Sequence, residues 1–245
     1  MILKLIIMVV CLFAVGAGII ILSHRIRKSE PNQRRNNWLK YYLYMTIICS
    51  MLVLARLGKE FMAVMLLVIA IVGAIELYQN LKIRGYLSIV IFLVNTFLLM
   101  FCLGHLLLWT SPAWFGTFSF VFILVAMTDS FSQLWGKLFG KHKLCPQLSP
   151  QKTWQGLMGG IFSTLAAALI FSFLVPDLTY LDILSSGLII AFAAVSGDLI
   201  FSFIKRKLLI KDFSCMIPGH GGVLDRFDSL IITAPVFYWC EKLVF

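Results

Sequence analysis

Long apolar segments recur along the chain, and short polar segments separate them. A membrane-spanning helix needs about 17 to 25 mostly apolar residues, because the hydrocarbon core is about 30 Å thick, and a helix satisfies its backbone hydrogen bonds internally. The pattern predicts an all-α polytopic integral membrane protein with about eight transmembrane helices, in a range of seven to nine. The spans are expected near residues 2–22, 38–55, 61–78, 86–108, 113–129, 154–175, 182–204 and 229–245.

The expected spans differ in how clearly the pattern marks them. The first, fourth, sixth and seventh are long and apolar, the second and fifth are shorter, and Pro235, Glu241 and Lys242 interrupt the last. The first segment has a long apolar core without a clear small-x-small cleavage site, and a strongly basic segment follows it. We therefore expect a retained span rather than a cleaved signal peptide.

The chain shows no linker, low-complexity segment or internal repeat that would divide it. We expect one membrane domain over residues 1–245, in which residues 1–110 are mainly structural. Polar residues gather in the second half, residues 111–245, in two long loops at 128–160 and 196–230. This uneven distribution predicts that the second half is catalytic and that its two polar loops face the cytoplasm.

Composition and charge support a membrane protein and orient it. Of the residues, 60% are hydrophobic and only 13% charged, against about 25% charged in soluble domains. If the spans alternate, 17 of the 21 Lys and Arg fall in or beside the loops on one side. The positive-inside rule makes that side the cytoplasm and places the N-terminus outside. The net charge of +10 then reflects orientation and contact with anionic lipid headgroups, and we expect no nucleic-acid partner. The six Cys form no CxxC pair, so neither a disulfide framework nor a zinc site is indicated.

Three carboxylates occur in or beside the second polar loop. Asp198 lies inside an apolar segment, where a lipid-facing charge would cost about 2.5 to 3.5 kcal/mol. If Asp225 begins a helix, Asp228 lies on the same face. Such carboxylates suit Mg²⁺, which takes one or two of them together with waters and substrate phosphates. The pattern predicts a Mg²⁺ site at Asp198, Asp225 and Asp228 and leaves a second metal ion open.

Cations and glycines lie between these carboxylates. Lys205, Arg206, Lys211 and Arg226 could hold phosphate oxygens, and Gly221 and Gly222 allow backbone N–H groups to approach an anion. Each feature also has a structural interpretation. An intramembrane Asp is often a salt-bridge residue, a Lys/Arg cluster is often an interfacial anchor, and the aspartates could favour a helix N-terminus. His220, as a lone histidine, fits a structural role as well as a catalytic one.

Two stretches resemble the phosphatidate cytidylyltransferases, also called CDP-diacylglycerol synthases. The stretch 202–228, "SFIKRKLLIKDFSCMIPGHGGVLDRFD", is similar to their signature, and 136–160, "GKLFGKHKLCPQLSPQKTWQGLMGG", resembles a second family segment. The resemblance covers roughly the C-terminal half. The signature's fixed positions are filled by Ser202, Lys205, Arg206, Lys211, Asp212, Pro218, His220, Gly221, Gly222, Asp225, Arg226 and Asp228.

The resemblance implies a reaction between CTP and phosphatidate that gives CDP-diacylglycerol and pyrophosphate with help from Mg²⁺. It implies metal-binding carboxylates at Asp198 and Asp225, with Asp228 alongside. Lys205, Arg206, Lys211 and Arg226 are then assigned to substrate phosphates, with His220 in the same catalytic set. The expected substrate-binding residues are Ser149, Lys152, Thr153, Ser202, Gly221 and Gly222.

The chain departs from the family pattern at two places. Phe201 stands where an acidic residue is usual, and Phe131, Ser132 and Gln133 replace a usual Gly-Ala-Tyr. The same chemistry on another lipid phosphate, such as an isoprenoid or ether lipid, therefore stays open. An anion transporter is the alternative from another class, but it would concentrate polar residues near the midplane. We expect an enzyme of the cell inner membrane whose site faces the cytoplasm, with membrane lipids as partners and a homodimer left open.

Overall fold

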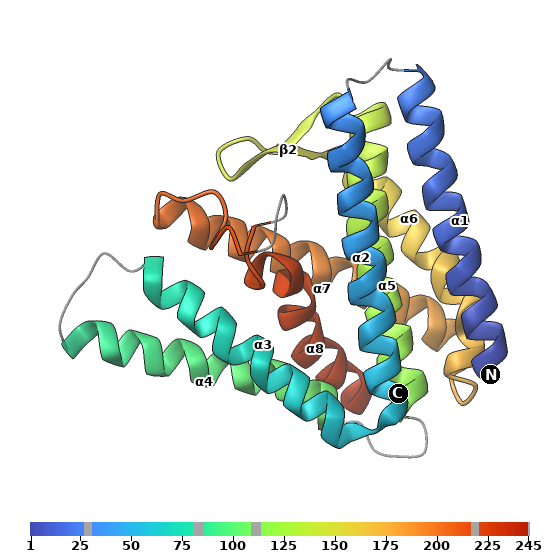
Figure 1. Ribbon diagram of the computed structural model, residues 1–245. Coiled ribbons are helices and arrows are strands. Elements are labelled where there is room, and N and C mark those ends of the chain that lie inside the picture. The colour runs from blue at the N-terminus through green and yellow to red at the C-terminus, as the bar shows by residue number, and fades with distance from the viewer. Residues whose placement is uncertain (27–30, 81–85, 109–113, 217–220, 245) are drawn as a thin grey trace.

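The computed structural model describes residues 1–26, 31–80, 86–108, 114–216 and 221–244 (Figure 1). These residues form eight α-helices, one short 3-10 helix and one two-stranded sheet. In chain order the elements are α1 (Ile2–Ile26), α2 (Pro31–Leu57), α3 (Lys59–Asn80), α4 (Tyr86–Leu108), α5 (Trp114–Phe139), β1 (Lys143–Cys145), β2 (Ser149–Thr153), α6 (Trp154–Ile170), η1 (Ser172–Leu174), α7 (Tyr180–Lys207) and α8 (Leu224–Val244).

The helices confirm the predicted fold class, an all-α polytopic membrane protein. Five of the described helices, α1, α2, α3, α5 and α7, are long and apolar enough to cross a membrane, and α6 is a shorter apolar helix. The total number of spans and an N-terminus on the outside stay predictions. Helix α4 has the bounds predicted for the fourth span, and Asp225 lies in the first turn of α8, as expected.

The first polar loop holds more regular structure than the sequence indicated. Helix α5 continues to Phe139, ten residues past the expected end of its span at residue 129. An antiparallel hairpin then follows, in which Lys143 pairs with Thr153 and Cys145 with Ser149. The hairpin leads directly into α6, since β2 ends at Thr153 and the helix begins at Trp154. The Thr153 side chain accepts a hydrogen bond from the N–H of Gly156 and so caps the helix.

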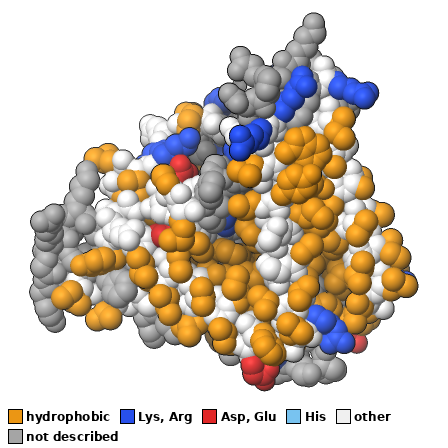
Figure 2. Space-filling model, in the orientation of Figure 1, with side chains coloured by type: hydrophobic (Ala, Val, Ile, Leu, Met, Phe, Trp, Pro, Cys, Tyr) orange, Lys and Arg blue, Asp and Glu red, His pale blue; other side chains and the backbone are white. Residues whose placement is uncertain are grey.

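The hairpin, the end of α1 and the start of α2 lie toward one end of the molecule, and the start of α1 and the end of α8 lie toward the other (Figure 1). In the space-filling view most of the visible Lys and Arg side chains gather at the hairpin end, above a broad apolar surface (Figure 2). This separation is what a membrane protein requires, since basic groups stay at the headgroups while apolar side chains face lipid. The basic end is therefore the one that carries the two polar loops.

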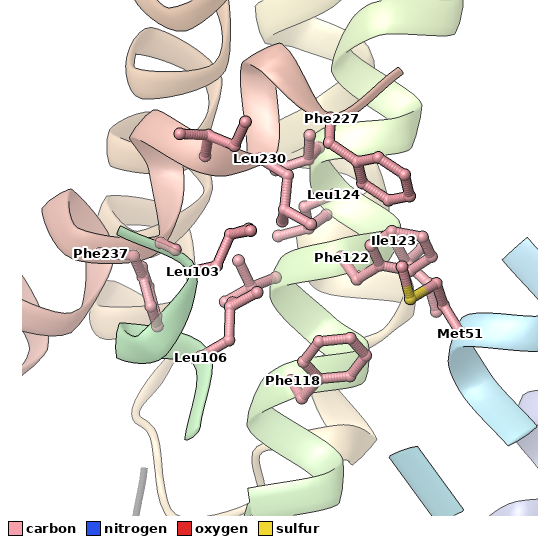
Figure 3. Packing of buried hydrophobic residues seen from close by; sticks show 14 of the residues in the cluster. Met51, Leu103, Leu106, Phe118, Phe122, Ile123, Leu124, Phe227, Leu230 and Phe237 are labelled. Carbon is pink, nitrogen blue, oxygen red and sulfur yellow. The ribbon is translucent and has the colours of Figure 1, made fainter. Parts of the chain in front are cut away.

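The core lies between α5 and the helices that surround it (Figure 3). Phe118 and Leu124 of α5 are fully buried, as are Leu103 of α4 and Phe237 of α8, and Met51 of α2 is fully buried as well. Dense packing of this kind resists displacement, because each buried side chain touches many neighbours. The core thus fixes α8 relative to α4 and α5, and with it the start of α8 where Asp225 lies.

Candidate functional site

Asp225 is the most firmly held carboxylate of the predicted site. Its side chain is 2% exposed, and its Oδ1 accepts an ion-paired hydrogen bond from Lys205 Nζ at 2.8 Å. Its Oδ2 accepts hydrogen bonds from the backbone N–H groups of Phe213 and Gly222, each at 2.9 Å. These three contacts hold the Asp225 carboxylate in one place at the start of α8.

Lys205 connects the end of α7 to two carboxylates of α8. Besides Asp225, its Nζ lies 3.8 Å from Asp228 Oδ2 and 5.6 Å from the centroid of the Phe213 ring. Asp228 Oδ1 accepts a hydrogen bond of 2.8 Å from the N–H of Ser229. One cation thus lies between two carboxylates and partly offsets their mutual repulsion.

Asp198 is paired with a lysine from the other polar loop. Lys152 Nζ of β2 lies 2.7 Å from Asp198 Oδ2 of α7, and the side chains are 20% and 36% exposed. The contact is a close ion pair whose angles are poor for a hydrogen bond. It joins the two polar loops at one place, although Lys152 and Asp198 lie 46 positions apart in the sequence.

A fourth aspartate, which sequence reasoning missed, lies beside these groups. Asp129 of α5 accepts a hydrogen bond of 3.1 Å from Ser229 Oγ, and Ser229 directly follows Asp228 in the chain. The sequence held a signal for it, because Asp129, like Asp198, lies within three residues of a long apolar run, where a carboxylate is costly.

The donor set suits a hard cation. Among the residues that the structure describes, no three His, Cys, Asp or Glu side chains are already arranged as a metal cluster. Mg²⁺ does not need one, since it usually binds through one or two carboxylates and keeps several waters. Asp198 lies beside Lys152, and Asp228 lies 3.8 Å from Lys205 Nζ, so a cation already neighbours each carboxylate, and a bound Mg²⁺ would take the place of these ammonium groups. The residues therefore fit Mg²⁺. Asp225 would bind the ion only if Lys205 left its carboxylate.

The predicted arginines occupy two different settings. Arg226 donates a hydrogen bond to the Tyr44 hydroxyl of α2 and lies over that ring, 5.6 Å from its centroid. Arg206 is exposed and donates to the backbone carbonyls of Leu148 and Ile210, at 3.0 and 3.1 Å. Arg206 thereby links the hairpin to the end of α7. Lys211, in the loop after α7, is exposed.

The predicted substrate-binding residues are likewise spread over several elements. Ser149 lies half-buried on β2, Thr153 is buried at the cap of α6, and Ser202 is buried on α7. His220 lies outside the described residues. The structure brings Lys152 into contact with Asp198, whereas the Thr153 hydroxyl is engaged by Gly156.

The two glycines before α8 lie against protein carboxylates. Gly221 has a φ of +81°, and a Cβ there would meet Asp225 Oδ2 at 2.8 Å. At Gly222 a Cβ would meet Glu76 Oε1 at 2.5 Å. Contacts this short exclude a side chain at either position without a shift of the neighbours. The glycines therefore let the chain turn between Glu76 of α3 and Asp225 of α8.

Phe201 forms a buried aromatic contact beside Asp225. It is 6% exposed, and its ring meets that of Phe213 edge-on with centroids 6.1 Å apart. Since the N–H of Phe213 donates to Asp225, Phe201 supports the residue that holds this carboxylate. An apolar contact thus occupies the place where the family resemblance leads one to expect an acidic group.

The comparison with family models gives one match over nearly the whole chain. The model described as the cytidylyltransferase family matches residues 1–244. The match includes α1–α4, for which the sequence motifs gave no indication beyond hydropathy, and also all the site residues described above.

Relatives agree with this match over different lengths. An uncharacterized protein of Escherichia coli is 46% identical over 49% of this chain and 41% of its own length. A phosphatidate cytidylyltransferase of Rickettsia felis is 45% identical over 50% of this chain and 57% of its own. Another of that name, from Rickettsia bellii, is 33% identical over 88% of this chain and 95% of its own. The chain therefore spans about half of the first two relatives and nearly all of the third.

Proposed function

This chain belongs to the cytidylyltransferase family, and we propose that it is a CTP-dependent lipid nucleotidyltransferase that converts CTP and phosphatidate to CDP-diacylglycerol and pyrophosphate. A phosphate oxygen of phosphatidate would form a bond to the α-phosphorus of CTP. The bond from that phosphorus to the oxygen bridging to the β-phosphorus would break, and pyrophosphate would leave. The reaction needs no covalent nucleophile from the protein, because such transfers depend chiefly on positioning and charge neutralisation.

The observation that carries the proposal is the set of three lysine–aspartate contacts. Lys152 meets Asp198, and Lys205 meets Asp225 and Asp228, so that each predicted metal carboxylate has a predicted phosphate-binding lysine beside it. Carboxylates and ammonium groups that pair without substrate can separate when a metal ion and phosphates offer each of them a new partner. Lysine suits such an exchange, since its charge sits on a flexible stem.

We assign Asp198, Asp225 and Asp228 to hold Mg²⁺, with room for a second ion left open. Bound there, Mg²⁺ would polarise the phosphoryl oxygens and stabilise the charge that develops on pyrophosphate. Lys152 and Lys205 would turn from the carboxylates to the substrate phosphates. The proposed exchange of partners starts from close contacts, since Lys152 Nζ lies 2.7 Å from Asp198 and Lys205 Nζ lies 2.8 Å from Asp225.

The remaining predicted residues are proposed in supporting roles. Arg226 would contact a phosphate with guanidinium nitrogens beyond the one that donates to Tyr44, and Arg206 and Lys211 would add positive charge where CTP enters. Ser149, Thr153, Ser202, Gly221, Gly222 and His220 stay assigned to substrate binding and to the phosphate environment.

The place of these residues suits substrates from two phases. Asp225 lies at the start of α8 and Lys205 near the end of α7, and Arg206, next to Lys205, donates a hydrogen bond to Leu148 of the hairpin. CTP would arrive from the cytoplasm while the acyl chains of phosphatidate stay in the bilayer, which in a bacterial cell would be the inner membrane. The homodimer stays a prediction.

A second acceptor is favoured by one observation. Phe201 fills the usual acidic position with an aromatic contact to Phe213, which removes one charge from the surroundings of Asp225. The same chemistry on an isoprenoid or ether lipid phosphate is therefore the alternative.

A purified-protein assay with a panel of acceptors tests both candidates. Pyrophosphate release would be followed with CTP and phosphatidate, with CTP and each other lipid phosphate, and with dCTP, ATP or no lipid as controls. Release that requires CTP and phosphatidate is expected. Release with only another lipid phosphate would support the alternative, and release independent of lipid would contradict both.

A further inference from the structure

Glu76 of α3 is a buried carboxylate, and among the described residues its side chain accepts hydrogen bonds from the loop before α8 and from the first residue of α8. It is 1% exposed. Its Oε1 accepts hydrogen bonds from Ser214 Oγ at 2.6 Å and from the N–H of Val223 at 2.9 Å. Its Oε2 accepts one from the N–H of Leu224 at 2.9 Å. A single side chain thus binds both the beginning and the end of the loop.

The position of Glu76 at the start of α8 has an electrostatic reason. The first N–H groups of a helix have no partner within the helix, and the helix dipole favours a negative charge there. Glu76 supplies both an acceptor and the charge, although it belongs to a helix almost 150 residues earlier in the chain. Hydrogen bonds to a charged acceptor contribute about 1.5 to 3 kcal/mol each, so this contact is a strong constraint on α8.

Asn80, one turn further along α3, fixes the other side of the same loop. Its Nδ2 donates to the backbone carbonyl of Phe213 at 2.6 Å and to the carbonyl of Glu76 at 2.7 Å. Phe213 in turn donates its N–H to Asp225 Oδ2. A continuous set of hydrogen bonds therefore leads from α3 through the backbone of Phe213 to the Asp225 carboxylate.

We propose that Glu76 and Asn80 are positioning residues that set the place of Asp225, acting through the loop that we name the α3-anchored loop (residues 213–216 and 221–224). This inference rests on the proposed function, because it assigns Asp225 a metal-binding role. Neither residue touches the reacting atoms. Their effect is to hold the Asp225 oxygens and the start of α8 in place while Lys205 moves between carboxylate and phosphate.

The close contact at Gly222 supports this assignment. A Cβ there would lie 2.5 Å from Glu76 Oε1, so the backbone approaches the carboxylate as closely as the absence of a side chain allows. Gly222 also donates its N–H to Asp225 Oδ2. The residue that packs on Glu76 is therefore the one that holds Asp225, and a shift at Glu76 would be passed on directly.

The first part of the test measures the anchor without using activity. Hydrogen exchange of peptides covering the α3-anchored loop would be compared between the full-length protein and Glu76→Gln, which keeps the side-chain size and removes the charge. We expect exchange in this loop to be faster by about tenfold or more. Glu60→Gln is the matched control, since Glu60 is exposed at the start of the same helix and should change nothing there.

The second part measures how the anchor affects the site. Outer-shell partners of metal ligands typically change metal affinity or activity by about 10- to 100-fold, so Glu76→Gln should raise the half-saturating Mg²⁺ concentration about tenfold. Ser214→Ala removes one of the three hydrogen bonds and should give a smaller rise of about threefold. A residue that only stabilised the fold would lower the amount of active protein and leave the Mg²⁺ dependence unchanged.

The outcomes separate the two proposals. Unchanged exchange in Glu76→Gln would overturn the anchor, and faster exchange with an unchanged Mg²⁺ dependence would overturn its positioning role. If Glu76→Gln does not fold, Ser214→Ala decides by the same two measurements. If the wild-type protein transfers no cytidylyl group, the proposed function fails and the positioning role with it, while the exchange result still decides whether the anchor exists.

Discussion

The two lysine–aspartate pairs of the site differ in how firmly the protein holds them. In the pair of Lys205 and Asp225 the side chains are 12% and 2% exposed, and two backbone N–H groups also bind the carboxylate. In the pair of Lys152 and Asp198 the side chains are 20% and 36% exposed. For this pair the structure shows the ion pair itself, without the backbone hydrogen bonds that Asp225 accepts. The first pair is tied to the backbone of the loop before α8 by hydrogen bonds from Phe213 and Gly222. The second pair connects the two polar loops through a single ion pair.

This difference teaches how one site can be both rigid and exchangeable. A buried ion pair that loses one partner leaves an uncompensated charge, which costs about 3 to 5 kcal/mol, whereas exposed pairs contribute about 0 to 1 kcal/mol. The Asp225 pair should therefore matter for folding and for chemistry. The Asp198 pair is more exposed as a whole, although Lys152 Nζ itself is buried. It should therefore matter less for folding than the Asp225 pair does.

The largest effect is expected when the buried pair loses its carboxylate. Asp225→Asn keeps the size of the side chain and removes the charge that would hold Mg²⁺, so transfer of labelled cytidylyl groups from CTP to lipid should fall about a thousandfold or more. Membrane insertion should stay intact. Asp177→Asn is the control, since Asp177 is exposed in the segment between η1 and α7. Undiminished turnover would remove Asp225 from the metal site.

Replacing the two lysines in turn tests the contrast itself. Lys205→Met leaves Asp225 and Asp228 without their shared cation, so it should destabilise the protein by about 3 kcal/mol and lower the thermal unfolding midpoint in detergent by about 6 °C or more. Lys152→Met should lower that midpoint by less than about 3 °C. Equal shifts in the two variants would show that burial does not distinguish the pairs.

For the more exposed pair, Lys152 and Asp198, we expect the main effect of a substitution on substrate binding. Lys152→Ala removes a charge assigned to a substrate phosphate, and the apparent KM for CTP or for the lipid should rise about tenfold. Steady-state kinetics at saturating Mg²⁺ would measure this rise, with Lys141→Ala as the control, because Lys141 is exposed before the hairpin. An unchanged KM for both substrates would speak against a substrate role for Lys152.

The smallest effect is expected at Phe201, beside the buried pair. Phe201→Glu restores the usual acidic group but loses the edge-on contact with Phe213, so the rate on at least one lipid phosphate should change by about threefold or more. Phe201→Leu controls for the loss of the ring. If neither variant alters the rate on any lipid phosphate in the panel, the departure at this position has no functional role.

Sequence reasoning located several helices closely, and it named acidic and basic residues of the second half that the structure brings together. Apolar segments of sufficient length indicated α3, α4 and α7 to within about three residues, because the bilayer imposes length and composition directly. The acidic and basic residues around Asp225 were found because a charge near lipid is costly and therefore conspicuous. The helices and the charged residues were both predictable because each is marked by a pattern within a short stretch of the sequence.

The contacts that sequence reasoning missed join distant segments. Glu76, Asn80 and Tyr44 belong to a stretch that we predicted to be mainly structural, yet they contact Leu224, Phe213 and Arg226. No spacing rule connects residues about 130 to 180 positions apart, so only the packed helices bring them together. The lysine partners were missed for the same reason, since both lysines were assigned to phosphates without the carboxylates that they contact.

The most direct test of cytidylyl transfer at the site around Asp225 is the stoichiometry of the two products. Purified protein would be given Mg²⁺, phosphatidate and CTP labelled at the α-phosphorus and in the cytidine, and lipid-bound label and free pyrophosphate would be measured together. The account predicts one CDP-diacylglycerol per pyrophosphate in the wild-type protein and neither product in Asp225→Asn. Pyrophosphate without labelled lipid, or equal amounts of both products in Asp225→Asn, would contradict it.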